Sequence, residues 1–176
     1  MRLTLHEHPH GVETGGCACV VYDVERNEAS FGAARVNGPA IVWELGGDGA
    51  GAALAADVEL DSSRDWIVRC DRVDFPPGAV AHRHVHPGPG IRRLLHGRLV
   101  VDAHGVEQTF GPGEAWFEGA EDPVLASARE ETAFVRLLLL PRVWAGRRTI
   151  RYLDPPDEEK PKLQRATVLL EKALEL

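Results

Sequence analysis

The sequence predicts an all-β protein, built as a small antiparallel β-barrel or jelly roll with an N-terminal arm and a C-terminal extension. Its 18 glycines and 12 prolines divide 176 residues into short apolar runs, a pattern typical of β-sandwiches and barrels. Residues 66–75 alternate with a period of two, which places Val68 and Val73 on opposite faces of one strand. Since both faces carry apolar groups, this strand is expected in a wall that is packed on two sides.

Three segments are expected along the chain. Residues 1–57 should form an N-terminal arm with strands, ending in a small, flexible loop over 46–57. Residues 58–145 should form the barrel, and residues 146–176 a C-terminal extension that packs on the barrel or on a partner subunit. Strands are predicted at 19–23, 41–45, 66–74, 79–86, 91–96, 99–102, 107–110, 115–118, 124–128 and 134–140. The tail 161–176 fits either a strand or a short amphipathic helix.

Composition excludes several classes of protein. The chain carries 20 Lys and Arg against 27 Asp and Glu, a net charge of −7, and lacks the clustered basic charge that nucleic acid requires. No apolar run is long enough to cross a membrane, and no leader pattern is visible, so a cytoplasmic location is expected. Cys17, Cys19 and Cys70 match no zinc-ribbon spacing and are expected to be buried free thiols.

The run from Pro76 to Gly97 carries the functional signal, because His82, His84 and His86 recur at two-residue spacing. On a straight strand all three imidazoles project from one face, roughly 6.5 Å apart between neighbours. Two neighbouring imidazoles can bind one metal ion, but the outer two stand too far apart. Spacing alone leaves open whether the first or the second pair would bind.

This run resembles the first motif of the cupin superfamily. Gly78 is followed by five residues, then by His84 and His86, and after three more residues and position 90 by six residues and Gly97. The resemblance covers about residues 65–141 and selects His84 and His86 as metal ligands. It implies a cupin-type β-barrel that encloses one small ligand, one divalent transition metal (Fe, Zn, Ni, Mn or Cu) and a homodimer.

Two ligands that the family usually has are missing. Position 90 holds Gly90 in place of the family's glutamate, and no histidine follows the turn 111–114 near Asp122, where the second motif would supply one. Glu118, at the end of a predicted strand, is the candidate third metal ligand, because two histidines and one carboxylate suit iron(II). The alternative for Glu118 is a surface or ion-paired residue.

Arg92 is the main candidate for binding a substrate. By alternation it shares a face with Gly90, and the cupin resemblance implies that this face is turned inward. Gly90 leaves room for a guanidinium there, and a guanidinium prefers carboxylate or phosphate oxygens. His82 and Trp116 complete the candidate substrate-binding set. The alternatives are a structural ion pair for Arg92, a solvated imidazole for His82 and a core position for Trp116.

Three functions follow from these residues. The first is a metal-dependent enzyme, an oxygenase or a non-redox isomerase, cyclase or lyase, acting on a small anionic or oxygen-rich molecule. The second is a binding or sensing module without chemistry, and the third is a degenerate barrel with an assembly role. A third metal ligand favours the first function, a pocket with Arg92 and no third ligand favours the second, and a plugged interior favours the third.

Overall fold

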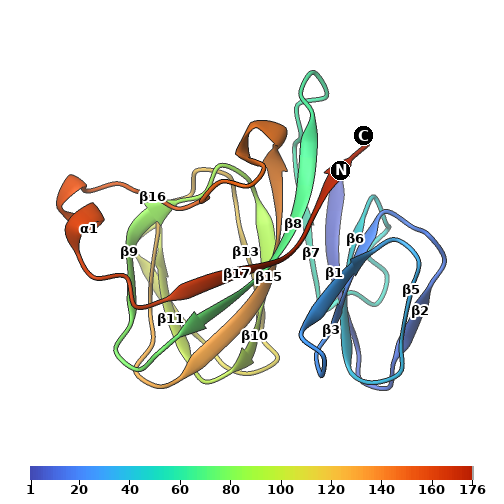
Figure 1. The fold of residues 1–176 in the computed structure, drawn as a ribbon, viewed down its shortest axis with the longest axis horizontal. Helices are drawn as coiled ribbons and strands as arrows, with labels where there is room; N and C mark the ends of the chain where they lie inside the picture. Colours follow the sequence, from blue (N-terminus) through green and yellow to red (C-terminus); the bar gives the residue numbers. More distant parts are fainter. Residues whose placement is uncertain (176) are drawn as a thin grey trace.

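The computed structural model describes residues 1–175 and confirms the expected all-β antiparallel fold (Figure 1). The elements are β1 (Arg2–His8), β2 (Val12–Thr14), β3 (Cys19–Asp23), β4 (Glu28–Phe31), β5 (Ala34–Val36), β6 (Ala40–Leu45), β7 (Leu54–Asp57), β8 (Trp66–Phe75), β9 (Val80–Val85), β10 (Gly90–His96), β11 (Leu99–Ala103), β12 (Val106–Phe110), β13 (Ala115–Glu118), β14 (Val124–Ser127), β15 (Thr132–Pro141), a 3₁₀ turn (Arg142–Trp144), β16 (Arg151–Tyr152), α1 (Pro155–Glu159) and β17 (Arg165–Leu174). No helix among the described residues is long and apolar enough to cross a membrane.

Three five-stranded sheets and one two-stranded sheet, β2-β5, make up the described residues. The N-terminal sheet has the order β4-β3-β6-β1-β7, the central sheet β13-β10-β15-β8-β17 and the far sheet β12-β11-β14-β9-β16. Figure 1 shows the N-terminal sheet on one side of the molecule and the far sheet on the other, with β8, β10 and β15 of the central sheet between them. The central sheet is therefore covered on both faces, as the alternation in residues 66–75 predicts.

The main hydrophobic core fills the space between the N-terminal and central sheets. Trp43 and Leu5 of the N-terminal sheet are fully buried, and so are Val68 and Leu137 of the central sheet. Each buried side chain of this size stabilises the fold by about 1.5–3 kcal/mol relative to its exposed state. This face of the central sheet is thus a conventional, filled core.

Residues 1–57 form a sheet where the sequence suggested an arm. Five of their strands make the N-terminal sheet, and β2 pairs with β5 in a separate two-stranded sheet that packs on its outer face. The expected loop over 46–57 contains β7, which pairs with β1. The tail 161–176 is a strand over its described part, because β17 extends the central sheet beside β8.

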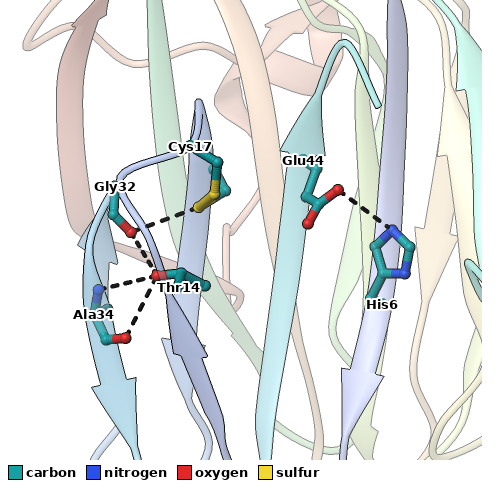
Figure 2. The surroundings of a disulfide bond; sticks show 7 residues. His6, Thr14, Cys17, Gly32, Ala34 and Glu44 are labelled. Carbon is teal, nitrogen blue, oxygen red and sulfur yellow. Dashed lines mark hydrogen bonds and ion pairs between the residues drawn. A yellow bond between two sulfur atoms is a disulfide. The ribbon is translucent and has the colours of Figure 1, made fainter. Parts of the chain in front are cut away.

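The cysteines differ from the sequence expectation. Cys17 and Cys19 form a disulfide, so they are not free thiols; Cys70 is free and buried. Figure 2 shows the disulfide at the start of β3, where the Cys19 Sγ lies 3.5 Å from the Gly32 carbonyl oxygen, which also accepts a hydrogen bond from the Thr14 hydroxyl. The sequence separates the two cysteines by a single residue, Ala18. Only the backbone turn between them brings their side chains together.

Candidate functional site

A cavity of about 620 Å³ lies between the central and far sheets. This volume is in the range of pockets that hold small organic molecules. The cavity is lined chiefly by side chains of the central sheet, of the far sheet and of the segment 146–152. The central sheet thus has a filled face toward the N-terminal sheet and a hollow face toward the far sheet.

Charged residues form one row across the hollow face of the central sheet. Arg92 of β10 lies opposite Arg136 of β15, and Arg136 lies opposite Asp71 of β8. All three side chains line the cavity and are at most 7% exposed. Two buried arginines therefore occupy paired positions on neighbouring strands, about 4.8 Å apart at the backbone.

Arg92 bends toward Gly90 and Glu118. Its Nη1 donates to the Gly90 carbonyl oxygen at 2.6 Å, and its Nη2 lies 2.6 Å from the Glu118 Oε2. The Arg92–Glu118 contact is a close, buried ion pair, although the Arg92 Nη2 makes no well-aligned hydrogen bond among the described residues. Burial lowers the pKa of Arg92 to about 10, so the guanidinium is protonated at neutral pH.

Gly90 allows β10 to pack closely against β15. It lies directly opposite Glu118 in the sheet, and a Cβ at this position would stand 2.1 Å from the Leu137 carbonyl oxygen. A side chain does not fit there, because it would collide with the backbone of β15. The Trp116 indole donates to the Glu118 Oε1 at 2.8 Å and holds the carboxylate in place.

Arg136 is bonded on both sides. It donates to the Asp71 Oδ2 through Nε at 3.2 Å and through Nη2 at 2.9 Å, and its Nη1 lies 3.1 Å from the His86 Nε2. The other carboxylate oxygen, Asp71 Oδ1, is buried and has no hydrogen-bond partner among the described residues. Among the described residues, the row therefore offers an unpaired acceptor on Asp71, and on Arg92 a guanidinium whose Nη2 is held by the ion pair with Glu118.

His84 and His86 face this row from the far sheet and the segment that follows β9. Their rings are 5.0 Å apart. The Nδ1 of His84 is bonded to the His82 carbonyl oxygen at 2.6 Å, and that of His86 to the Thr149 carbonyl oxygen at 3.2 Å. Since a carbonyl only accepts, both Nδ1 atoms carry the proton and both Nε2 atoms are acceptors.

Both imidazoles are neutral at pH 7. Burial lowers the pKa of His84 to about 4. Burial, reinforced by the positive charge of Arg136, lowers the pKa of His86 well below its ordinary value. The bond from Arg136 occupies the acceptor of His86, so the His84 Nε2 is the free imidazole acceptor of the pair.

His82 does not share this environment, which corrects the expectation that the three histidines project from one face. Val124 pairs with His84, but Ala126 pairs with Ala81. An advance of three residues in β9 therefore spans the same length as an advance of two residues in β14. This bulge reverses the alternation. His84 and His86 line the cavity, whereas His82 is absent from its lining and contributes only its backbone carbonyl.

One end of the cavity is apolar. Trp116 stacks on Phe110 with ring centroids 4.6 Å apart and meets Phe134 edge-on at 5.3 Å. The apolar lining residues are Val73, Phe75, Ala81, Leu99, Val101, Trp116, Val124, Ala126 and Phe134. A ligand with an apolar body therefore has a surface to pack against, next to the charged row.

The more exposed lining residues mark the mouth, between the segment 146–148 and the beginning of β17. Arg148 and Lys162 stand over the Tyr152 ring, 5.3 and 4.7 Å from its centroid. Arg69 holds the mouth segment to the central sheet, because its guanidinium donates to the carbonyl oxygens of Trp144 and Arg147 at 2.7 Å each. The mouth is thus positively charged and anchored.

The lining as a whole carries more cations than anions. Six side chains are basic (Arg69, Arg92, Arg136, Arg147, Arg148 and Lys162), and three are acidic (Asp71, Glu118 and Glu171). Such an excess raises the local concentration of anionic ligands and speeds their entry. This cavity suits an anion although the chain as a whole has a net charge of −7.

Sequence reasoning located part of this site. Arg92, Trp116, His84, His86 and Glu118 all line the cavity. Arg136 and Asp71 were missed as functional residues. Alternation in residues 66–75 does place Asp71 on one face with Arg69, but Arg136 lies within the apolar run 134–140, where a single charge between hydrophobic neighbours was the available signal.

The donor atoms do not fit the metal ion that the cupin resemblance implies. Residues 1–175 contain no group of three or more His, Cys, Asp or Glu side chains placed to share an ion. The His86 Nε2 contacts Arg136, and Glu118 faces Arg92. The metal-binding role of His84, His86 and Glu118 stays a prediction, which these contacts do not favour.

Comparisons with known proteins concern the fold. No family model matches the sequence, and no curated protein matches it. An RmlC-like cupin from Shewanella frigidimarina is 17% identical, with a TM-score of 0.40 over 43% of this chain and 68% of that one. A cupin superfamily protein from Desulfitobacterium hafniense is 14% identical, with a TM-score of 0.40 over 48% and 74%.

An oxalate oxidase structure is also similar, with 20% identity and a TM-score of 0.41, over 49% of this chain and 46% of that one. Cupins are thus among the solved structures that this chain is similar to, as the motif resemblance predicts. At these identities and scores, no residue role and no activity is transferred from them.

Proposed function

We propose that the cavity binds a small organic acid with an apolar body, as a binding or sensing module. One observation supports this above the others: two buried arginines, Arg92 and Arg136, occupy paired positions on neighbouring strands and both line the cavity. A guanidinium is the side chain best suited to a carboxylate, because its planar donors match both oxygens.

The surroundings of the two guanidinium groups strengthen such binding. A charge-assisted hydrogen bond inside a protein is stronger than in water, since the local dielectric constant is low. The apolar end formed by Trp116, Phe134 and their neighbours adds hydrophobic contact with the body of the ligand. The positive mouth favours the entry of an anion.

A metal-dependent enzyme, an oxygenase or an isomerase, cyclase or lyase, is the second candidate. It is supported by the close approach of the His84 and His86 rings and by the tethering of both Nδ1 atoms to carbonyls, a feature of histidines that bind metals. Elemental analysis separates the two candidates, on untagged protein and on the His84→Ala/His86→Ala variant. A stoichiometric metal that is lost in the variant favours the enzyme.

Benzoate tests the binding proposal, with neutral benzamide as the matched probe. We expect benzoate to raise the melting temperature of the protein with saturation, and benzamide at the same concentration to leave it unchanged. A ligand at 100 times its Kd stabilises a protein by about 2.7 kcal/mol. A melting temperature that responds to neither probe, or equally to both, overturns the proposal.

Paired variants assign the binding to Arg92. Arg92→Met/Glu118→Gln removes the ion pair without leaving either charge buried alone, and the glutamine keeps an acceptor for Trp116. We expect this variant to lose the benzoate shift. Arg93→Met is the control, because Arg93 lies on the same strand but pairs with Glu7 on the other side of the sheet. An equal benzoate shift in both variants contradicts the assignment.

A further inference from the structure

The row Arg92–Arg136–Asp71 has a hydrogen-bond acceptor to which a ligand with only a carboxylate and a hydrocarbon body cannot donate. Asp71 is one of the residues that line the cavity, and its Oδ1 is buried without a hydrogen-bond partner among the described residues. A buried polar atom without a partner destabilises the folded protein, and more so when it carries charge. A ligand that donates to this oxygen removes this destabilisation.

Arg92 and Asp71 lie at opposite ends of the row. Arg92 is on β10 and Asp71 on β8, with β15 between them, so their backbones are separated by two strand spacings, roughly 10 Å. The Arg92 guanidinium also bends away toward Gly90 and Glu118. A molecule that contacts both groups carries its acid and its donor several bonds apart.

The charge of the cavity decides what kind of donor fits. Asp71 already neutralises Arg136, through two hydrogen bonds to its Oδ2, and basic side chains outnumber acidic ones in the lining. The positive charge of an ammonium group on the ligand would be repelled by this excess of cations. A neutral hydroxyl donates equally well and adds no charge.

A second acceptor faces the same space. The His84 Nε2 carries a lone pair, because the Nδ1 of that ring is bonded to the His82 carbonyl oxygen. Two acceptors of different origin, a carboxylate oxygen and an imidazole nitrogen, therefore face one cavity whose other polar groups are mainly cations. This combination suits a hydroxyl-bearing molecule better than a plain hydrocarbon acid.

We infer that the natural ligand is a hydroxylated organic acid, whose carboxylate meets Arg92 and whose hydroxyl, several bonds away, donates to the Asp71 Oδ1. This inference rests on the proposed function and specifies its substrate class. It assigns Asp71 the part of selecting the hydroxyl, while Arg136 keeps the Asp71 carboxylate in place.

Three probes with one scaffold test the substrate class by calorimetric titration: benzoate, 4-hydroxybenzoate and 4-(aminomethyl)benzoate. We expect the hydroxyl to tighten binding by about tenfold or more, since hydrogen bonds to charged groups contribute about 1.5–3 kcal/mol. The ammonium probe should bind no tighter than benzoate.

The outcomes distinguish this inference from the proposed function on which it rests, the binding of a small organic acid. Equal affinity for benzoate and 4-hydroxybenzoate overturns the hydroxyl contact with Asp71 but leaves the binding of acids intact. In that case a water molecule can satisfy the Asp71 oxygen. Tightest binding of the ammonium probe overturns it in favour of a zwitterion. No binding of any of the three overturns both the substrate class and the binding of acids.

Asp71→Asn assigns the hydroxyl contact, because it keeps the shape of the side chain and removes its charge. We expect the advantage of 4-hydroxybenzoate over benzoate to shrink to about twofold. Asp74→Asn is the control, since Asp74 is on the other face of β8 and pairs with Arg72; it should keep the full advantage. A full advantage in Asp71→Asn overturns the assignment. The comparison of probes on the wild-type protein stands even if this variant fails to fold.

Discussion

The two faces of the central sheet are made by the same strands but serve different purposes. Toward the N-terminal sheet, Val68, Val135 and Leu137 pack into a filled core. Toward the far sheet, the intervening positions Asp71 and Arg136 border a cavity of about 620 Å³. Because successive side chains of a strand point to opposite faces, one strand can stabilise the fold with one face and bind a ligand with the other.

The hollow face is the more polar of the two and the more costly to build. Burial of charged groups is unfavourable unless each is paired and hydrogen-bonded. Arg69, Arg92 and Arg136 each meet one carboxylate, yet two polar atoms in the row remain without partners. Buried polar atoms without partners are uncommon in folded proteins, and these two belong to residues that line the cavity.

The two faces should respond differently to loss of the same side chain. Trp43 is fully buried on the filled side, and Trp116 borders the cavity. We expect Trp43→Ala to lower the free energy of unfolding by up to about 5 kcal/mol, because it creates a new cavity. Trp116→Ala should cost roughly half as much, since one side of its indole already faces open space. Urea denaturation measures both, and a larger loss for Trp116→Ala would contradict the distinction.

The next largest effect concerns the buried pair of Arg136 and Asp71. Arg136→Met should destabilise the protein by about 3–4 kcal/mol, because it leaves the Asp71 carboxylate buried without its cation. Arg136→Met/Asp71→Leu should recover most of this loss while abolishing the response to benzoate. Chemical denaturation of the two variants checks the prediction. A double variant that is less stable than the single one contradicts the prediction, because the ion pair would then stabilise the fold by more than the mutual neutralisation of its two charges.

Acid should weaken the hollow face selectively through His84. Burial lowers the pKa of His84 to about 4, below the ordinary value of 6.5, so the unfolded chain binds the proton first as the pH falls. This contribution to stability is complete above about pH 6.5 and is lost as the pH falls toward 4, by about 3 kcal/mol at most. His84→Asn should show a shallower dependence. Denaturation midpoints between pH 7 and 4 test this, and identical slopes would contradict it.

The smallest effect is expected on the filled side, at its rim. Arg93 and Glu7 form a two-point ion pair between the central and N-terminal sheets, with bond lengths of 3.0 and 3.1 Å. Since both side chains are partly exposed, Arg93→Met should cost less than about 1 kcal/mol. Thermal denaturation at low and high salt measures it. A loss equal to that of Arg136→Met would mean that exposure does not distinguish the two arginines.

Some of the site could be predicted because local sequence patterns carry it. Spacing alone left the histidine pair open, and the resemblance of the interval from Gly78 to Gly97 to the cupin motif selected His84 and His86; the absence of a side chain at Gly90 indicated room for Arg92. The bulge in β9 could not be predicted, since it depends on the register with β14. Arg136 was missed for a related reason: its partner Asp71 is 65 residues away in sequence, and only pairing of β8 with β15 brings them together.

By itself, the sequence determined the β architecture, the two-faced character of residues 66–75 and the face that Arg92 shares with Gly90, because all three depend on the period of the strand and on glycine and proline. The tertiary structure decided that residues 1–57 are a sheet covering one face of the central strands. It also decided that His82 leaves the site while Arg136 and Asp71 enter it. Those outcomes depend on pairing and stacking between distant segments, and no local pattern encodes the register of strands that are far apart in the chain.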